Sequence, residues 1–222
     1  MRRTTDCEIE LNFTTSRKGL EALRGGKCEL AGFNFPKSSS NNSKAFETFG
    51  HLLTENNRLI FFATRLQGLA VAPNNPKKIY SILDIASRKA RFINRREGTG
   101  TRILFDQILD VLAVKPEEIE GYNDISDTQF FTAVQIAAGK VDVGLCTANV
   151  AKENGLEFIP LAKEVYYLAA DQKFLETQKA KKFLQFLRSY DWSEHKEQLE
   201  GYDFNGTGEV FKVSDVFPSE GN

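Results

Sequence analysis

The segment from Ala90 to Leu109 combines residue types that suit the binding of an anion. Gly98 and Gly100 allow the backbone to approach a ligand closely, and Thr99 and Thr101 place hydroxyl groups where a helix begins. The first turn of a helix also carries unpaired N–H groups and a partial positive charge. These features predict an anion site at this turn, and the cations near it are Arg95, Arg96 and Arg102.

The pattern around the turn predicts the elements that hold it. Phe92 and Ile93 precede the turn as a short buried strand, and apolar residues recur after it at helical spacing. An ordinary capped connection is the alternative interpretation, with Arg102 bridging to Asp106 one helical turn later. The turn is neither a Walker A loop nor a dinucleotide fingerprint, because no Gly-Lys-Ser/Thr follows it and the third glycine of the fingerprint falls at Ile103.

The composition is that of a globular protein without a strong charge bias. A chain of 222 residues can bury a substantial core, and its net charge of −1 argues against bulk attraction to nucleic acid or to an anionic membrane. A basic run between Arg88 and Arg102 offers a nucleic-acid or phosphoprotein surface as a competing function, but no aromatic platform accompanies it. The sequence has no apolar run of about 20 residues and no secretory signal, so we expect a cytoplasmic protein without a membrane partner.

Catalytic and metal chemistry find little support in the sequence. The only histidines are His51 and His195, and neither lies in a cluster with metal-ligand spacing. No nucleophile elbow is present, and Cys146 follows an apolar strand like a core residue. Cys7 and Cys28 are likewise expected as small residues in a reducing compartment. We therefore expect no metal, no cofactor and no enzymatic activity.

Strand and helix signals alternate along most of the chain, which predicts an α/β architecture with parallel sheets. Two long apolar segments, Arg58–Ala72 and Glu157–Asp171, each consist of two extended halves. In the first segment the halves meet near Leu66–Gly68. This pattern is typical of a chain that crosses from one lobe to another. We therefore expect lobe one at residues 1–66 and 167–222, and lobe two at residues 67–166. The other expected elements are strands at Cys7–Phe13 and Glu29–Phe33, helices at Ser16–Arg24, Lys44–Leu53, Lys173–Tyr190 and Asp191–Leu199, and a polar loop at Pro36–Ser43.

A faint internal echo relates the two lobes. Thr15 aligns with Thr128 at an offset of 113 residues, and the Gly-Lys pairs 26–27 and 139–140 follow at the same offset. Each copy predicts a hydroxyl-bearing turn, a helix, a Gly-Lys stop and a strand. Together with the turn at Thr99–Thr101, the echo predicts three helix starts at one cleft, where the carboxyl ends of the strands lie.

Three stretches, in their order and spacing, resemble the type II periplasmic-binding-protein fold. They are FINRREGTGTR, SDTQFFTAVQIAAGKVDVGL and GLEFIPLAKEVYYLAA. The earlier stretches SRKGLEALRGGKCELAGFNF and QGLAVAPNNPK fit the same pattern, so the resemblance runs from about Thr14 to Ala170. More narrowly, the sequence resembles the molybdate-binding-like branch, whose domain is often attached to a helix-turn-helix regulator.

The resemblance implies an oxyanion held between the lobes. The implied donors are Thr99, Gly100, Thr101 and Arg102 from one turn, Ser126 and Thr128 from a second, and Thr14, Thr15 and Ser16 from a third. Tyr166 lies near the return crossing and either lines the cleft or packs at the hinge beside Tyr167. Gln129 stands where the resemblance leads us to expect a histidine.

The family fold normally opens with a strand and a helix, whereas this chain begins at what corresponds to the second strand. Either the chain lacks that opening unit or a partner supplies it. In both cases strand Cys7–Phe13 would expose an edge that can pair with another copy.

We therefore expect a solute-binding or ligand-sensing domain that captures a small oxyanion, molybdate or tungstate first, by closure of its lobes. The resemblance also implies a possible partner, a DNA-binding regulator module that is either fused to this domain or separate from it. A small-molecule enzyme or an organic-anion binder on the same scaffold is the alternative, because fold does not determine function.

Overall fold

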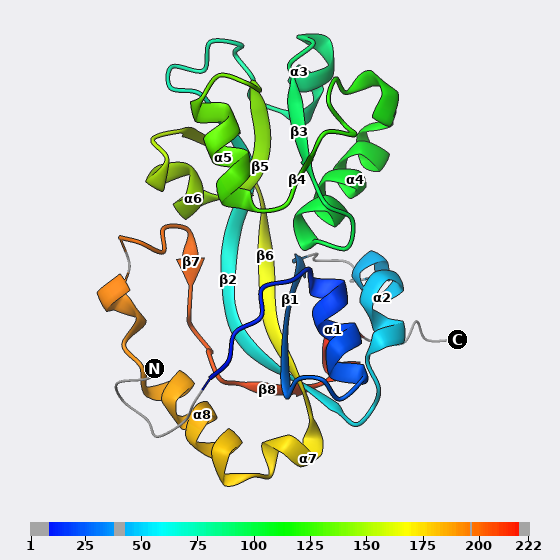
Figure 1. Ribbon diagram of the computed structural model, residues 1–222, viewed down its shortest axis with the longest axis vertical. Coiled ribbons are helices and arrows are strands. Elements are labelled where there is room, and N and C mark those ends of the chain that lie inside the picture. The colour runs from blue at the N-terminus through cyan, green and yellow to red at the C-terminus, as the bar shows by residue number, and fades with distance from the viewer. Residues whose placement is uncertain (1–8, 38–42, 196, 218–222) are drawn as a thin grey trace.

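A computed structural model describes residues 9–37, 43–195 and 197–217 of the chain. Two lobes lie one above the other, and two long strands, β2 (Asn57–Val71) and β6 (Glu157–Asp171), run through both (Figure 1). The prediction of two crossings is confirmed, and β6 has the predicted bounds. The expected lobe boundaries fall inside these continuous strands and stay a prediction.

The crossing strands β2 and β6 are each 15 residues long and pair antiparallel along their length. Their register shifts between Gln67 and Gly68, where the sequence predicts that two extended halves meet. Gly68 allows this close approach, because a Cβ atom there would lie 2.1 Å from the Ile159 carbonyl oxygen.

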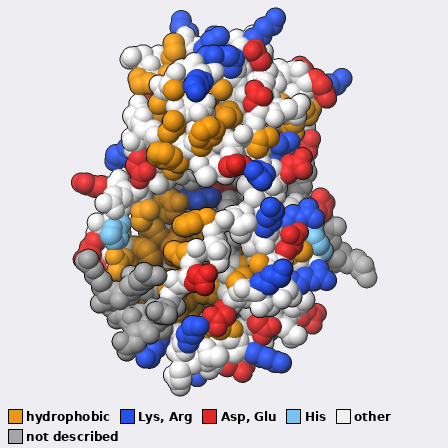
Figure 2. Space-filling view, in the orientation of Figure 1, with side chains coloured by type: hydrophobic (Ala, Val, Ile, Leu, Met, Phe, Trp, Pro, Cys, Tyr) orange, Lys and Arg blue, Asp and Glu red, His pale blue; other side chains and the backbone are white. Residues whose placement is uncertain are grey.

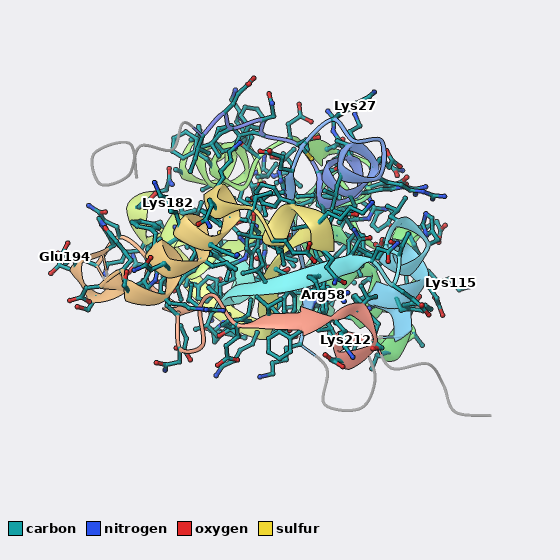
Figure 3. All side chains as sticks on the ribbon, turned by 90° about the horizontal axis from the view of Figure 1, so that it is seen from below. Lys27, Arg58, Lys115, Lys182, Glu194 and Lys212 are labelled. Carbon is teal, nitrogen blue, oxygen red and sulfur yellow. The ribbon has the colours of Figure 1, made fainter. Side chains whose placement is uncertain are left out.

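Lobe one has a core of aromatic rings. The ring of Phe33 packs against the rings of Phe35, Phe49 and Tyr167, with centroids 5.9, 5.6 and 6.1 Å away. Its elements are α1 (Ser16–Arg24), β1 (Leu30–Pro36), α2 (Ser43–Phe49), a 3₁₀ turn at Gly50–Leu52, α7 (Gln172–Leu175), α8 (Gln178–Ser189), a 3₁₀ turn at Trp192–His195, β7 (Tyr202–Asp203), β8 (Val210–Lys212) and α9 (Val213–Val216). Seen from below, β8 lies beside β2, in the register that pairs Arg58 with Lys212 (Figure 3).

Lobe two has an aliphatic core around the stacked rings of Phe92 and Phe105, whose centroids are 4.4 Å apart. Its elements are α3 (Ile82–Ser87), β3 (Phe92–Arg95), α4 (Gly100–Leu112), a 3₁₀ turn at Pro116–Glu118, β4 (Ile125–Ser126), α5 (Gln129–Ala137), β5 (Val143–Thr147) and α6 (Ala148–Glu153). Cys146 is fully buried in a second small core, and burial raises the pKa of its thiol to about 12. Its predicted role as a core residue is confirmed.

The sheet is mixed rather than parallel. The described strands follow the order β1-β6-β2-β5-β3-β4, with β7 and β8 paired to β2. Only β3 pairs in parallel, with β4 and with β5, and every other described pair is antiparallel. The parallel arrangement expected from the sequence therefore holds in lobe two alone, because the antiparallel strands β2 and β6 form the centre of the sheet.

The structure shows the internal echo in both lobes. Helices α1 and α5 are nine residues long, and each is capped by the threonine that the echo pairs, Thr15 and Thr128. The glycine after each helix has a left-handed backbone, with φ of 66° at Gly26 and 67° at Gly139. The following strands begin at Leu30 and Val143, again at the same offset.

Several expected elements differ from those observed. Residues 9–13 of the expected strand Cys7–Phe13 form no strand, and Leu11 and Phe13 are exposed; residues 7 and 8 lie outside the described ranges. Alternation without a pairing partner does not make a strand, so the exposed edge at 9–13 is a wrong prediction, and β1 is the edge strand instead. Most of the expected loop Pro36–Ser43 lies outside the described ranges.

The C-terminal region was predicted least well. The expected helix Lys173–Tyr190 is divided into α7 and α8, because Thr177 caps a new helix start. In the expected helix Asp191–Leu199, the described residues form only a short 3₁₀ turn, at Trp192–His195. No described helix is both long enough and apolar enough to span a bilayer.

Candidate functional site between the lobes

Three helices begin at the junction of the lobes, and contacts between their first turns bring them together. The backbone N–H of Arg17 in α1 donates to the carbonyl oxygen of Gly98, just before α4, at 3.3 Å. Gly100 lies so close to Asn34 of β1 that a Cβ atom there would be 2.1 Å from the Asn34 Nδ2. Gln129 of α5 donates to Thr101 of α4 at 3.1 Å. The helix starts of α1, α4 and α5 therefore meet, as the sequence predicts.

The threonine that caps each of these helices uses its hydroxyl within its own first turn. Thr15, Thr99 and Thr128 each accept a hydrogen bond from the backbone N–H three residues later, at 3.3, 3.3 and 3.0 Å. Thr99 also donates to the Arg96 carbonyl oxygen at 2.8 Å. These three hydroxyls therefore stabilise the helices as N-caps.

The other predicted hydroxyl residues are divided between the interior and the surface. Ser16 is buried, and its Oγ lies 3.4 Å from both the backbone N and the Oδ1 of Asn34. Ser126 is fully buried and donates to the Thr128 carbonyl oxygen at 2.8 Å. Thr14 is exposed.

The arginines near the predicted anion site have different partners. Arg102 lies 2.8 Å from Asp106, so the alternative interpretation of a helical-turn bridge is present in the structure. Arg102 also donates to the Tyr122 hydroxyl at 2.6 Å. Arg96 pairs with Asp127 at the surface. The charges of Arg96 and Arg102 are therefore compensated within lobe two.

Arg95 is buried and has no carboxylate partner among the described residues. Its side chain donates through Nη1 to the Ser126 carbonyl oxygen at 2.7 Å, while its buried Nε has no described partner. Burial lowers the pKa of Arg95 to about 10, and the like charge of Arg65 acts in the same direction, whereas Asp127 opposes the shift. The guanidinium is still charged at neutral pH. A buried charge of this kind is costly unless an anion or another acceptor compensates it.

A second polar group lies on the crossing strands. Arg65 of β2 stands opposite Glu164 of β6, and the two side chains form an ion pair at 2.9 Å. The Arg65 guanidinium also lies 5.6 Å from the centre of the Tyr166 ring. Burial raises the pKa of Tyr166, and its hydroxyl occupies the space that a Cβ atom at Gly32 would need. Tyr166 therefore packs against β1 and β2, and its place in the cleft stays a prediction.

Gln129 links three elements of lobe two and the crossing strand β2. Its Oε1 accepts from the backbone N–H and the hydroxyl of Thr147, at 3.0 and 2.9 Å, at the start of α6. Its Nε2 donates to Thr101 and, at 3.4 Å, to the Oε1 of Gln67. A glutamine can make all these bonds at once, because it has both an acceptor and two donor hydrogens.

Four buried side chains at this junction each keep a polar atom without a hydrogen-bond partner in the described chain. They are Asn34 (Nδ2), Gln67 (Nε2), Arg95 (Nε) and Glu164 (Oε1), and we call them the interlobe cluster; a fifth such atom is Oδ1 of Asn149, at the start of α6. All four are at least nine-tenths buried, with exposed fractions of 8, 0, 7 and 0%. Buried polar groups are rarely left unpaired, so the cluster calls for an explanation.

Strand pairing places three members of the interlobe cluster on one face of the sheet. Residues directly opposite each other in an antiparallel pair share a face, as do residues two apart along a strand. Glu164 stands opposite Arg65, and Gln67 is two residues beyond Arg65. Asn34 stands opposite Tyr166, two residues from Glu164. The surface is hollowed between the lobes on the left of the view, above a hydrophobic wall of lobe one (Figure 2).

A family model described as the PBP superfamily domain matches residues 1–188. The chain belongs to this family. The match covers the whole of lobe two and the helix starts at the junction, so the type II periplasmic-binding-protein resemblance is confirmed.

Two curated relatives are similar in sequence. The uncharacterized protein YvgK of Bacillus subtilis is 32% identical over 185 residues, which cover 83% of this chain but only 59% of YvgK. An uncharacterized protein encoded in the 5' region of a ferredoxin 2Fe-2S gene of Clostridium pasteurianum is 27% identical over 49% of this chain and 96% of its own length.

Solved structures of low sequence identity share the two-lobed fold. A Clostridium perfringens protein, solved with bound phosphate, has a TM-score of 0.64 at 16% identity and covers 89% of both chains. PhnD1 of Prochlorococcus marinus, solved with methylphosphonate, has a TM-score of 0.58 at 16% identity and covers 93% of this chain and 80% of its own. PEB3, solved with L-phospholactate, has a TM-score of 0.59 at 14% identity, with 90% and 89% covered.

Sequence reasoning missed most of the interlobe cluster. Asn34, Gln67 and Glu164 lie in apolar strands, and their burial follows from pairings between segments far apart in the chain. The sequence indicates Arg95 as a cation near the turn, but not as one of the implied donors. No local signal identifies Arg95, because neither Arg95 nor Arg96 has an acidic residue four positions away, yet Arg96 is paired with Asp127 in the structure.

Proposed function

We propose that this domain binds a small oxyanion between its lobes, with Arg95 as the principal cation. The observation that carries the proposal is the buried Arg95 guanidinium, which has no carboxylate partner among the described residues and keeps a free Nε donor. An anion at this place would compensate the charge and satisfy the donor.

The neighbouring groups support the same assignment. The amides of Asn34 and Gln67 each keep a free N–H donor, and the first turns of α1, α4 and α5 meet beside them. A hydrogen bond to a charged group contributes about 1.5–3 kcal/mol and a helix start about 0.3–1 kcal/mol. At the upper end of these ranges, three donors and three helix starts contribute about 12 kcal/mol, which leaves about −8 kcal/mol, or micromolar affinity, after an ordering cost of about 4 kcal/mol.

The fold makes lobe closure the natural way to capture such a ligand. Similar structures have been solved with phosphate, methylphosphonate and L-phospholactate, which are all small anions. Because the sequence also resembles the molybdate-binding-like branch, we add molybdate and tungstate to the candidate ligands. Domains of that branch are often attached to a DNA-binding regulator, so we propose such a module, fused or separate, as a partner. The alternative of an organic-anion binder is favoured by the aromatic rings of Phe62, Trp192 and Phe204, which pack together next to Tyr166.

A thermal-shift panel tests the proposal. Inorganic phosphate, methylphosphonate, phospholactate, sulfate, molybdate and tungstate are each added at millimolar concentration. A ligand that binds the native state raises the melting temperature by mass action, so we expect at least one of them to do so. The absence of a shift with every anion would contradict the proposal, as would a shift of the same size in the variant Arg95→Met.

A further inference from the structure

Lobe one carries a second group of aromatic rings, separate from the core around Phe33. We call this group the aromatic wall, and its members are Phe62 of β2, Tyr166 of β6, Trp192, Tyr202 and Phe204. The centroid of the Phe62 ring lies 5.5 Å from that of Tyr166 and 5.4 Å from that of Trp192. Phe204 stacks between Trp192 and Tyr202, with centroids 4.6 and 5.7 Å away. The rings therefore form one continuous apolar surface.

The aromatic wall is partly open to solvent, whereas the core on the other face of the same sheet is closed. Tyr166 and Tyr167 are consecutive in β6 and point to opposite faces, and Tyr167 packs against Phe33. Phe33 is completely buried, but all five rings of the wall are partly exposed. In Figure 2, hydrophobic side chains of lobe one border the hollow between the lobes from below. The wall therefore keeps apolar surface that a ligand in the hollow can cover.

Arg65 joins the aromatic wall to the interlobe cluster. Its Nε pairs with Glu164, its Nη1 donates to the Tyr202 hydroxyl at 3.4 Å, and its guanidinium lies 5.6 Å from the centre of the Tyr166 ring. Gln67, whose Nε2 is free, is two residues beyond Arg65 on the same face of β2. Two residues of a strand span about 7 Å, so the wall begins about that far from a free donor of the cluster.

Charge and size restrict what the wall can hold. The Arg65 charge is compensated by Glu164, so the part of a ligand that lies here should be neutral. An inorganic oxyanion held by the free donors is too small to reach the wall and would leave it in water. Aromatic rings attract one another edge to face or offset-stacked, and a guanidinium attracts the face of a ring. A ligand that joins an oxyanion to an aromatic ring by a short linker therefore meets both surfaces.

We propose that the aromatic wall is a second subsite, which holds the aromatic ring of an organic oxyanion whose negative end is bound by Arg95. The ligand class is then arylalkyl phosphonates, aryl phosphate esters and similar ring-bearing oxyanions, in preference to inorganic ions. This inference rests on the proposed function and narrows its ligand to one class.

Calorimetric titration with a matched pair of anions tests the subsite. Benzylphosphonate and methylphosphonate have the same charged group and differ only in the ring. In the wild type, we expect benzylphosphonate to bind at least about tenfold more tightly, because its ring covers the wall and contacts other rings. Equal affinity for the two anions, or weaker binding of benzylphosphonate, would overturn the inference.

Phe62→Leu removes one ring of the wall and keeps an apolar side chain in its place. The preference for benzylphosphonate should fall at least about threefold, while the affinity for methylphosphonate stays within about twofold of the wild type. Phe46→Leu is the matched control, because the Phe46 ring is also exposed in part but packs against Phe217 of the closed core. Its preference should equal that of the wild type. An unchanged preference in Phe62→Leu, or an equal loss in Phe46→Leu, would contradict the role of the wall.

A second measurement uses only the wild type and does not depend on a variant folding. Trp192 is the only tryptophan of the chain, and its ring belongs to the wall. We expect its fluorescence to change as benzylphosphonate is added, with saturation at the affinity measured by calorimetry, and to change much less with methylphosphonate. No change with benzylphosphonate, or the same change with both anions, would mean that the ligand ring does not contact the wall.

The outcomes separate this inference from the proposed function. If phosphate and methylphosphonate bind but benzylphosphonate has no advantage, the domain binds oxyanions and the aromatic wall has a structural role only. If no anion binds, benzylphosphonate included, the proposed function fails and the inference fails with it.

Discussion

The capping threonines and the interlobe cluster lie side by side, but their polar groups differ in how they are paired. Thr15, Thr99 and Thr128 sit at helix starts and engage their hydroxyls within their own first turns. The cluster residues, exemplified by Gln67 and Arg95, are more deeply buried and keep unpaired atoms. The two regions therefore have different expected costs: changing a cap should affect the stability of the fold, and changing the cluster should affect the affinity for the ligand.

The largest effect is expected at Arg95. Arg95→Met removes the uncompensated buried charge, so the affinity for the best oxyanion of the panel should fall by about 3 kcal/mol, roughly 150-fold. The free energy of unfolding without ligand should not decrease, because the variant no longer buries an unpaired charge. Calorimetric titration and urea unfolding measure the two quantities.

Arg96→Met is the control for this prediction. Arg96 is the neighbour in sequence, but its charge is paired with Asp127 at the surface, where ion pairs contribute little. We expect its affinity to stay within about twofold of the wild type. Equal losses in the two variants would indicate a general field effect rather than a site at Arg95.

A smaller loss is expected at the contact between the lobes. A Cβ atom at Gly100 would meet the Asn34 backbone oxygen at 2.4 Å as well as its side chain, so Gly100→Ala should separate α4 from β1. The apparent affinity should fall roughly tenfold, because the binding-competent arrangement is less populated. Small-angle scattering should show a larger radius of gyration.

Gly19→Ala provides the comparison for Gly100→Ala. Gly19 lies inside α1, where an added Cβ would make contacts of 3.6 Å or longer. This variant should keep both its affinity and its radius of gyration. Unchanged affinity in Gly100→Ala would show that the ligand does not need the lobes in contact at this place.

The smallest effect on binding is expected at the caps. Thr99→Val removes the N-cap of α4 and should cost about 1 kcal/mol of unfolding free energy, while the intrinsic affinity stays nearly unchanged. Thr177→Val removes the cap of α8 in lobe one and should lower the stability by a similar amount. If Thr99→Val alone weakened binding more than tenfold, its hydroxyl would be a direct ligand after all.

Local patterns in the sequence predicted the frame of the site well. The bounds of α1 and β6 were predicted correctly, and so was the strand-turn-helix unit around Gly98–Arg102, because capping residues and apolar periodicity are read within a few positions. The echo between Thr15 and Thr128 also has a direct counterpart in two capped helices.

Pairing between distant segments was not predictable in the same way. The burial of Gln67 depends on β5 and β6, and the partner of Arg96 lies 31 residues away. For the same reason, the mixed sheet and the C-terminal strands β7 and β8 were missed, since short strands gain their stability from the neighbour they pair with. Which polar groups stay unpaired is thus a property of the folded arrangement.

The most direct test is a crystal structure of the chain grown with inorganic phosphate. The account predicts phosphate oxygens within hydrogen-bond distance of Arg95 Nε and of the free amides of Asn34 and Gln67. An anion bound only at the exposed side of the Thr99 turn, with Arg95 untouched, would contradict it.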